Sequence, residues 1–214
     1  MGKMTKRTND KFVRYRRTIN SNCNYGLMHL KIVGYLNKYF EENPNDYRKL
    51  CVLFFRTTED AHSYIFLSYI FRIFDKSRSA LSIFKFLDFI ERYLDILFPN
   101  KKDLVKRKIV TDKKLLNSRK DLLDKLRTIR NKAHFHQDLD YAGNYLQVYR
   151  LNFVPAEKLE NLIKLVMKIV DYYSFLFDSR RITFEIEKHI EGDINDLFEL
   201  IYRGERAFDK DAKN

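Results

Sequence analysis

Apolar side chains recur every three or four residues over most of the chain, which is the period of one buried face of an α-helix. Glycine and proline, which interrupt helices, number only 6 and 3 among 214 residues. The pattern therefore predicts an all-α fold, an antiparallel bundle of four to five main helices with additional terminal helices. Helices are expected at about residues 25–40, 44–55, 61–75, 80–98, 101–136, 155–178 and 192–208.

Three stretches leave the local structure open. The polar residues 57–60 either break a helix or form an exposed turn of one. Residues 137–154 form the longest irregular region, in which 145–151 fit a short extended piece. Residues 182–187 fit a strand as well as a helix.

The chain is expected to divide into an arm and one domain. Residues 1–20 are polar and basic and lack the apolar core of a signal peptide, so they are expected to be a flexible basic arm. Residues 21–210 are expected to form a single helical domain. The most apolar run, 64–74, is interrupted by Arg72 and is too short to span a bilayer. A cytoplasmic protein without membrane contact is therefore expected.

Positive charge is concentrated in two blocks of the sequence. The formal net charge is +12, and residues 1–17 hold seven basic side chains against one acidic one. Residues 101–132 hold thirteen basic and four acidic side chains, with the break between two helices expected at Asn117 and Ser118. Such blocks either bind a polyanion or form solvated helix faces, and charge alone does not decide between these interpretations.

The second basic block leads into a cluster of arginine, asparagine and histidine. Four of these side chains have the spacing of one helical stripe: Arg127, Arg130, Asn131 and His134. His136 lies off that stripe unless the helix ends near Ala133, and Asp138 follows closely. The other histidines of the chain stand alone in the sequence.

These residue types suit cleavage of RNA without a metal ion. A neutral imidazole takes the proton of a ribose 2′-hydroxyl, because its pKa lies near neutral pH. Guanidinium groups bind the phosphate and stabilise the charge that develops on it. Asparagine can orient a hydroxyl or the imidazole. The alternative is structural: the arginines pair with Asp121, Asp124 or Asp138, and the histidines stabilise a helix C-terminus.

No metal ion or other cofactor is expected. His134 and His136 are two residues apart and do not share a helix face, and no acidic residue has the spacing of a further ligand. The two cysteines, Cys23 and Cys51, are too few for a disulfide framework and are expected to be buried thiols.

The segment from Arg130 to His136 resembles the ribonuclease motif of the HEPN superfamily (higher eukaryotes and prokaryotes nucleotide-binding). In that motif an arginine, usually followed by a polar residue such as Asn131, is separated from a histidine by four to six intervening residues. Asp138, two residues beyond His136, is similar to the motif ending of a prokaryotic branch linked to abortive phage infection.

A second stretch carries the same resemblance. Residues 68–75, including Arg72 and Asp75, look like the end of the first long helix of that branch, and residues 79–87 look like the restart after it. The resemblance covers about residues 46–178.

The resemblance implies a HEPN helical bundle that forms a homodimer, in which two motifs meet across a cleft. Some members are metal-independent ribonucleases that act as toxins or antiviral effectors, whereas others bind nucleotides or are inactive scaffolds. RNA is then the expected partner, with an antitoxin or another protein as a further one.

The resemblance also assigns roles to residues. Arg130, Asn131 and His136 match the catalytic positions, while Arg127 and His134 form an alternative register that also fits the family spacing. Asp138, which follows His136 as the motif ending implies, is a secondary candidate. Arg72 and Asp75 are expected either to support the site or to form an ion pair or a helix-end cap.

Two functions from different classes therefore follow. The first is a metal-independent endoribonuclease of phage defence or of a toxin–antitoxin system, which cleaves single-stranded RNA. The second is a non-catalytic helical module that binds a nucleotide, RNA or a protein.

Overall fold

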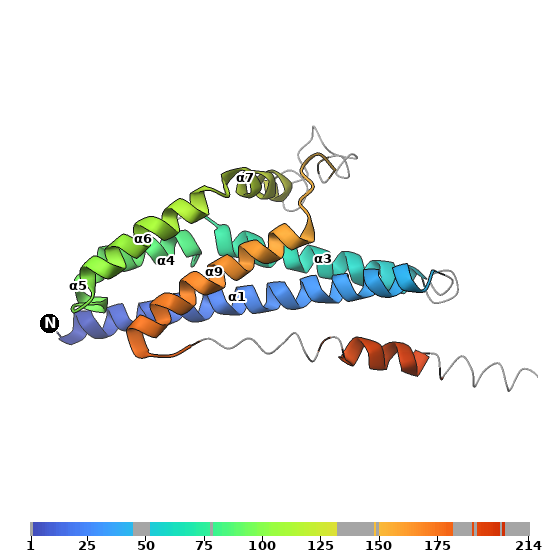
Figure 1. Ribbon diagram of the computed structural model, residues 1–214, viewed down its shortest axis with the longest axis horizontal. Coiled ribbons are helices and arrows are strands. Elements are labelled where there is room, and N and C mark those ends of the chain that lie inside the picture. The colour runs from blue at the N-terminus through green and yellow to red at the C-terminus, as the bar shows by residue number, and fades with distance from the viewer. Residues whose placement is uncertain are drawn as a thin grey trace, which may run out of the picture. The chain divides into compact units, whose positions relative to one another are not determined.

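Every regular element in the described part of the chain is a helix, which confirms the predicted all-α fold (Figure 1). The computed structural model describes residues 2–44, 52–77, 79–131, 148, 150–181, 190, 192–201 and 203. Its labelled helices are α1 (Gly2–Glu42), α3 (Val52–Phe74), α4 (Ile83–Arg92), α5 (Leu94–Leu97), α6 (Lys102–Asn117), α7 (Lys120–Ile129) and α9 (Ala156–Asp178).

The chain groups into two compact units, and α1 and α3 contribute residues to both. The first unit comprises Met1–Gly26 and Leu67–Ile182. The second comprises Leu27–Phe66 and Thr183–Asn214. The candidate site residues that the structure describes belong to the first unit.

The first half of α1 is a packed helix, which corrects the flexible arm expected at residues 1–20. Phe12 and Ile19 are fully buried, and the Phe12 ring lies 5.4 Å from that of Phe86 and 4.4 Å from that of Phe177, between ring centroids. Basic residues on the opposite side of the helix hid this apolar stripe in the sequence. Helix α1 is 41 residues long, which also exceeds the length of the helix expected over residues 25–40.

Two breaks shape the middle of the first unit. The helix expected over residues 80–98 begins after Ser82, whose hydroxyl accepts the backbone N–H of Lys85, and it is divided at Tyr93 into α4 and α5. The break expected at Asn117 and Ser118 is confirmed, because α6 ends there and α7 follows.

Polar contacts connect α9 to α6 and α1. The Tyr173 hydroxyl of α9 donates to the fully buried Asp112 carboxylate of α6 at 2.9 Å, and the Lys108 ammonium binds the other oxygen of the same carboxylate. The guanidinium of Arg16 in α1 binds Asp178 at the end of α9 at 2.7 Å. A buried carboxylate is stable only with such partners, so these contacts fix how the three helices pack.

The stretches left open by the sequence have different outcomes. Thr57 and Thr58 donate their hydroxyls to carbonyls one turn earlier, so residues 57–60 are a turn of α3. The extended piece expected at 145–151 is wrong for Val148, Arg150 and Leu151, which are helical. Residues 182–187 lie outside the described residues. The helix expected at about 155–178 is confirmed as α9, and residues 192–201 of the last expected helix are helical.

The second unit has its own small aromatic core. Leu36, Phe55 and Phe198 are buried together, with the Tyr39 ring stacked on Phe198 at 3.5 Å between centroids. In the same unit, the Nδ1 atoms of His29 in α1 and His62 in α3 lie 2.7 Å apart, within hydrogen-bond distance.

No helix among the described residues combines the length and the apolar character that a membrane crossing requires.

Substitution of Phe12 by alanine tests the packing of the first half of α1. Removing a buried phenyl ring leaves a cavity, so Phe12→Ala should lower the free energy of unfolding by about 3–5 kcal/mol. The exposed Arg14 supplies a matched control, because Arg14→Ala should change it by less than about 0.5 kcal/mol. Denaturant unfolding measures both. Equal stability of the two variants would show that residues 1–20 form an arm after all.

Mild acid should destabilise the second unit. Burial lowers the pKa of His29 and His62 below the ordinary 6.5, and the neighbouring His62 lowers that of His29 further. Below pH 6.5 the unfolded chain therefore binds protons that the folded chain does not, and the free energy of unfolding decreases as pH falls towards the folded-state pKa values. Urea unfolding at pH 7.5 and 5.5 measures the difference, which should be smaller in the double variant His29→Gln/His62→Gln. The same pH dependence in both proteins would contradict this assignment.

Candidate functional site

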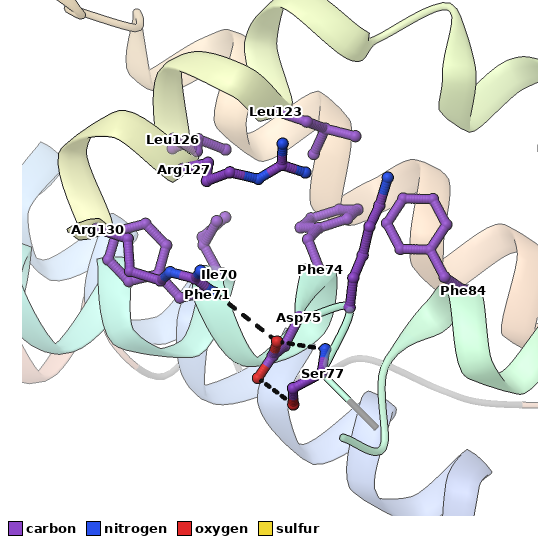
Figure 2. A pocket seen from close by; sticks show the side chains of 11 residues that line it. Ile70, Phe71, Phe74, Asp75, Ser77, Phe84, Leu123, Leu126, Arg127 and Arg130 are labelled. Atoms are coloured by element: carbon purple, nitrogen blue, oxygen red, sulfur yellow. Dashed lines mark hydrogen bonds and ion pairs between the residues drawn. The ribbon is translucent and has the colours of Figure 1, made fainter. Parts of the chain in front are cut away.

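A cavity of about 290 Å³ lies between the end of α3, the start of α4 and α7, all within the first unit. Figure 2 shows Leu123 and Arg127 of α7 on one side of it and Asp75 and Ser77 on the other. Three phenyl rings, Phe71, Phe74 and Phe84, line it as well.

The acidic side of the cavity is built by the turn that ends α3. The backbone N–H and the hydroxyl of Ser77 both donate to the carboxylate of Asp75, at 2.8 and 3.0 Å. This is the turn that aspartate forms with the residue two positions later, and it stops the helix after Phe74. The Asp75 carboxylate is thereby held at the cavity in one orientation.

The basic side is built by the amphipathic pattern of α7. Leu126 and Ile129 are buried at 3% and 4% exposure, which leaves Arg127 and Arg130 facing the cavity and solvent. Arg130 is the residue that ends α7 and keeps right-handed helical dihedral angles.

Two neighbours hold the guanidinium of Arg130. Its Nη1 lies 3.7 Å from Asp75 Oδ1, and its Nε donates to the side-chain oxygen of Asn131 at 3.0 Å. The ion pair is about one third exposed on each side, so solvent screens it and its contribution to stability is modest. Its larger effect is to limit the orientations of the guanidinium.

Arg127 has a separate acidic partner. Its Nη1 donates to Asp124 on the preceding turn of α7 at 3.3 Å, and about half of each side chain is exposed. The structural alternative drawn from the sequence, pairing with nearby aspartates, thus holds for Arg127 with Asp124.

The cavity lining carries an excess of positive charge. Lys76, Arg127 and Arg130 are cationic, while Asp75 is the acidic residue among those that line it. The Lys76 ammonium lies 4.7 Å from the centroid of the Phe84 ring. An anion that enters would therefore meet three cations beside an apolar surface.

The structure brings together some of the predicted site residues. Arg130, Asn131 and Asp75 are in direct contact, with Arg127 one turn away. Arg72 is exposed and lies over the Tyr69 ring at 5.4 Å, so it is outside the cavity and forms no buried ion pair. His134, His136 and Asp138 lie outside the described residues.

Sequence reasoning missed two contributors to the site, Lys76 and Phe84. Lys76 lies between the helices expected at 61–75 and 80–98, and Phe84 lies within the second of them. A signal existed for Lys76, because it directly follows the Asp75 that ends an apolar helix. Nothing in the sequence distinguished Phe84, which is only partly buried, from its fully buried neighbour Phe86.

Among the residues that the structure describes, no group of three or more histidine, cysteine or acidic side chains is arranged to hold a metal ion. Cys23 is a buried free thiol, and burial raises its pKa well above the usual range.

Comparison with known proteins gives one match. The family model HEPN_AbiU2, described as AbiU2, matches residues 30–200, which is well over half of the chain. The chain belongs to the HEPN_AbiU2 family. The resemblance to a HEPN family of abortive infection is confirmed by this match, whereas the arginine–histidine motif stays a prediction. No curated protein and no solved structure matches the chain.

The HEPN_AbiU2 match contains both sides of the cavity. It spans Asp75 at the end of α3 and Arg130 at the end of α7, and it also spans α9. The first half of α1 precedes it, although Phe12 packs into the same core. The chain is therefore a HEPN-type helical module with a cationic cavity.

Proposed function

We propose that this protein is a metal-independent endoribonuclease that cleaves single-stranded RNA as a cytoplasmic effector of phage defence or of a toxin–antitoxin system. The observation that carries the proposal is the contact of Arg130 with Asp75 and Asn131 at the edge of a cationic cavity. The predicted motif assigns this arginine to catalysis, and the chain belongs to a HEPN family.

The proposed reaction is a transfer within the RNA strand. His136 accepts the proton of the ribose 2′-hydroxyl, and the 2′-oxygen attacks the adjacent phosphorus. The bond from phosphorus to the 5′-oxygen of the next nucleotide breaks, and that oxygen takes up a proton. The products are a 2′,3′-cyclic phosphate and a 5′-hydroxyl end. His134 with Arg127 is the alternative register.

Arg130 is suited to the phosphate by its position and its chemistry. A guanidinium binds two phosphate oxygens at once and stabilises the extra negative charge of the transition state. Asn131 accepts from the Nε of Arg130, which leaves its own amide N–H groups to orient a ribose hydroxyl. Arg127 and Lys76 add positive charge along the same cavity.

The partners are proposals of the same kind. A homodimer would bring two such sites to one cleft, which supplies the second set of cations for an RNA strand. An antitoxin or another protein would keep the nuclease inactive until infection. The basic face of α6 and the basic first half of α1 would add contacts to RNA that depend on salt rather than on sequence.

The first test is RNA cleavage by the purified full-length protein in excess EDTA. Wild type should produce cyclic phosphate ends. His136→Ala should reduce the rate by about 10²–10⁴-fold through loss of the base, and Arg130→Ala by about 10²–10³-fold through loss of charge stabilisation. Gel analysis of end-labelled RNA measures the rates. Lys168→Ala on α9, whose exposed side chain lies away from the cavity, is the control for nonspecific loss of charge.

Two outcomes contradict this mechanism. If RNA is still cleaved after both His136→Ala and His134→Ala, neither imidazole acts as the base. Absence of cleavage by wild type, together with salt-sensitive RNA binding, would favour a non-catalytic binding module. The ion pair of Arg127 with Asp124 is the observation that supports this second function, because it gives that arginine a structural role.

Asp75 should act as a positioning residue for Arg130. Asp75→Ala releases the guanidinium and removes the turn at Ser77, so kcat should fall by about 10–100-fold. KM should fall or stay unchanged, because the cavity gains net positive charge. Arg72→Ala is the matched control from the same helix end and should leave both constants unchanged. Steady-state cleavage of a fluorescent RNA measures them, and equal effects of the two variants would contradict the role of Asp75.

A further inference from the structure

Two phenyl rings keep accessible surface inside the cavity. Phe74 and Phe84 are partly exposed, with centroids 6.3 Å apart and planes at 63°. Leu123 is partly exposed as well, whereas Ile70, Phe71 and Leu126 are buried, at 0%, 6% and 3% exposure. The buried residues therefore form the floor, while the two rings and Leu123 supply the accessible apolar surface of the cavity.

Cations lie next to these rings. The Lys76 ammonium is 4.7 Å from the Phe84 centroid, and Figure 2 shows Arg127 and Arg130 extending from α7 towards the same cavity. Aromatic surface and positive charge together suit a ligand with a flat aromatic part and an anionic part. A phosphate alone would leave the rings uncovered, and an apolar molecule would make no use of the positive charge of Lys76, Arg127 and Arg130.

We infer that the cavity is a base-binding subsite, in which a nucleobase stacks on the Phe84 ring in place of the Lys76 ammonium, with the inclined Phe74 ring at its edge, while its phosphate is bound by Arg130 and Arg127. The identification of the ligand as a nucleotide of RNA rests on the proposed function. The volume of about 290 Å³ is at the lower end of small-molecule sites, which is enough for one nucleotide. Purines stack over a larger area than pyrimidines, so the subsite prefers a purine.

The absence of tryptophan from the sequence allows a direct test of where the base binds. Phe84→Trp places a single indole in the cavity wall of the full-length protein. Titration with guanosine 3′-monophosphate should quench its emission in a saturable manner, because the base stacks on the indole. Phe153→Trp is the control, since Phe153 is 67% exposed and lines no part of this cavity. Ribose 5-phosphate, which lacks a base, should not quench either variant.

A second pair of variants measures the contribution of the ring. Phe84→Leu keeps an apolar side chain but loses the stacking surface, so calorimetry should show guanosine 3′-monophosphate binding weakened by roughly 5–100-fold. Phe84→Tyr keeps the ring and should retain affinity. Wild type should bind the uridine nucleotide more weakly than the guanosine one. Thermal unfolding of each variant verifies that the fold is intact.

The outcomes separate this inference from the proposed function. No saturable quenching of Phe84→Trp, or equal affinity of wild type and Phe84→Leu, overturns the subsite even when the protein cleaves RNA. Equal quenching of Phe153→Trp overturns it too. Nucleotide binding that depends on Phe84 in a protein without any cleavage overturns the nuclease and leaves the subsite in place.

Discussion

The burial of Phe12 is the contact on which the first unit depends. Its ring packs against Phe86 of α4, Phe98 after α5 and Phe177 of α9, at centroid distances of 5.4, 6.1 and 4.4 Å. Three segments far apart in the sequence therefore share one aromatic centre, which lies in a part of α1 that precedes the family match. Large aromatic side chains dominate the energy of such a core, so the placement of α4 and α9 follows from it.

The cavity is a consequence of how two helices end. α3 stops because Asp75 turns back onto Ser77, and α7 ends at Arg130, whose partner Asn131 follows directly. Helix ends leave polar groups without helical partners, which is why charged side chains can be positioned there without distorting a core. The apolar rings beside them also lie at helix ends, because Phe74 is the last residue of α3 and Phe84 the second residue of α4.

The all-α fold was predictable because apolar residues recur along the sequence at the spacing of a helix face. The apolar spacing gave α9 and the break between α6 and α7 with bounds close to those observed. The first half of α1 was not recognised, because Phe12 and Ile19 are separated by basic residues that suggested a solvated arm. The division at Tyr93 was also missed, since the apolar stripe continues through it and only backbone geometry reveals the change.

The site was predictable only in part, for a different reason. Arg130 and Asn131 are neighbours in sequence, and their contact follows from that, whereas the pairing of Arg130 with Asp75 depends on tertiary packing across 55 positions. Arg72 and Asp75 looked equivalent in the sequence, three residues apart near the end of one helix. The hydrogen bond from Ser77 holds the Asp75 carboxylate at the cavity, while Arg72 lies over the Tyr69 ring.

The Asp75 carboxylate beside Arg130 acts as a permanent internal competitor for any anion that reaches this arginine. In the proposed reaction the phosphodiester and the more highly charged transition state would both share the guanidinium with Asp75, which keeps it oriented. The same competition weakens the hold on the cleaved product once the extra charge is gone. An ion pair of little value for stability would thus shorten the time that each product occupies the site and would favour rapid turnover.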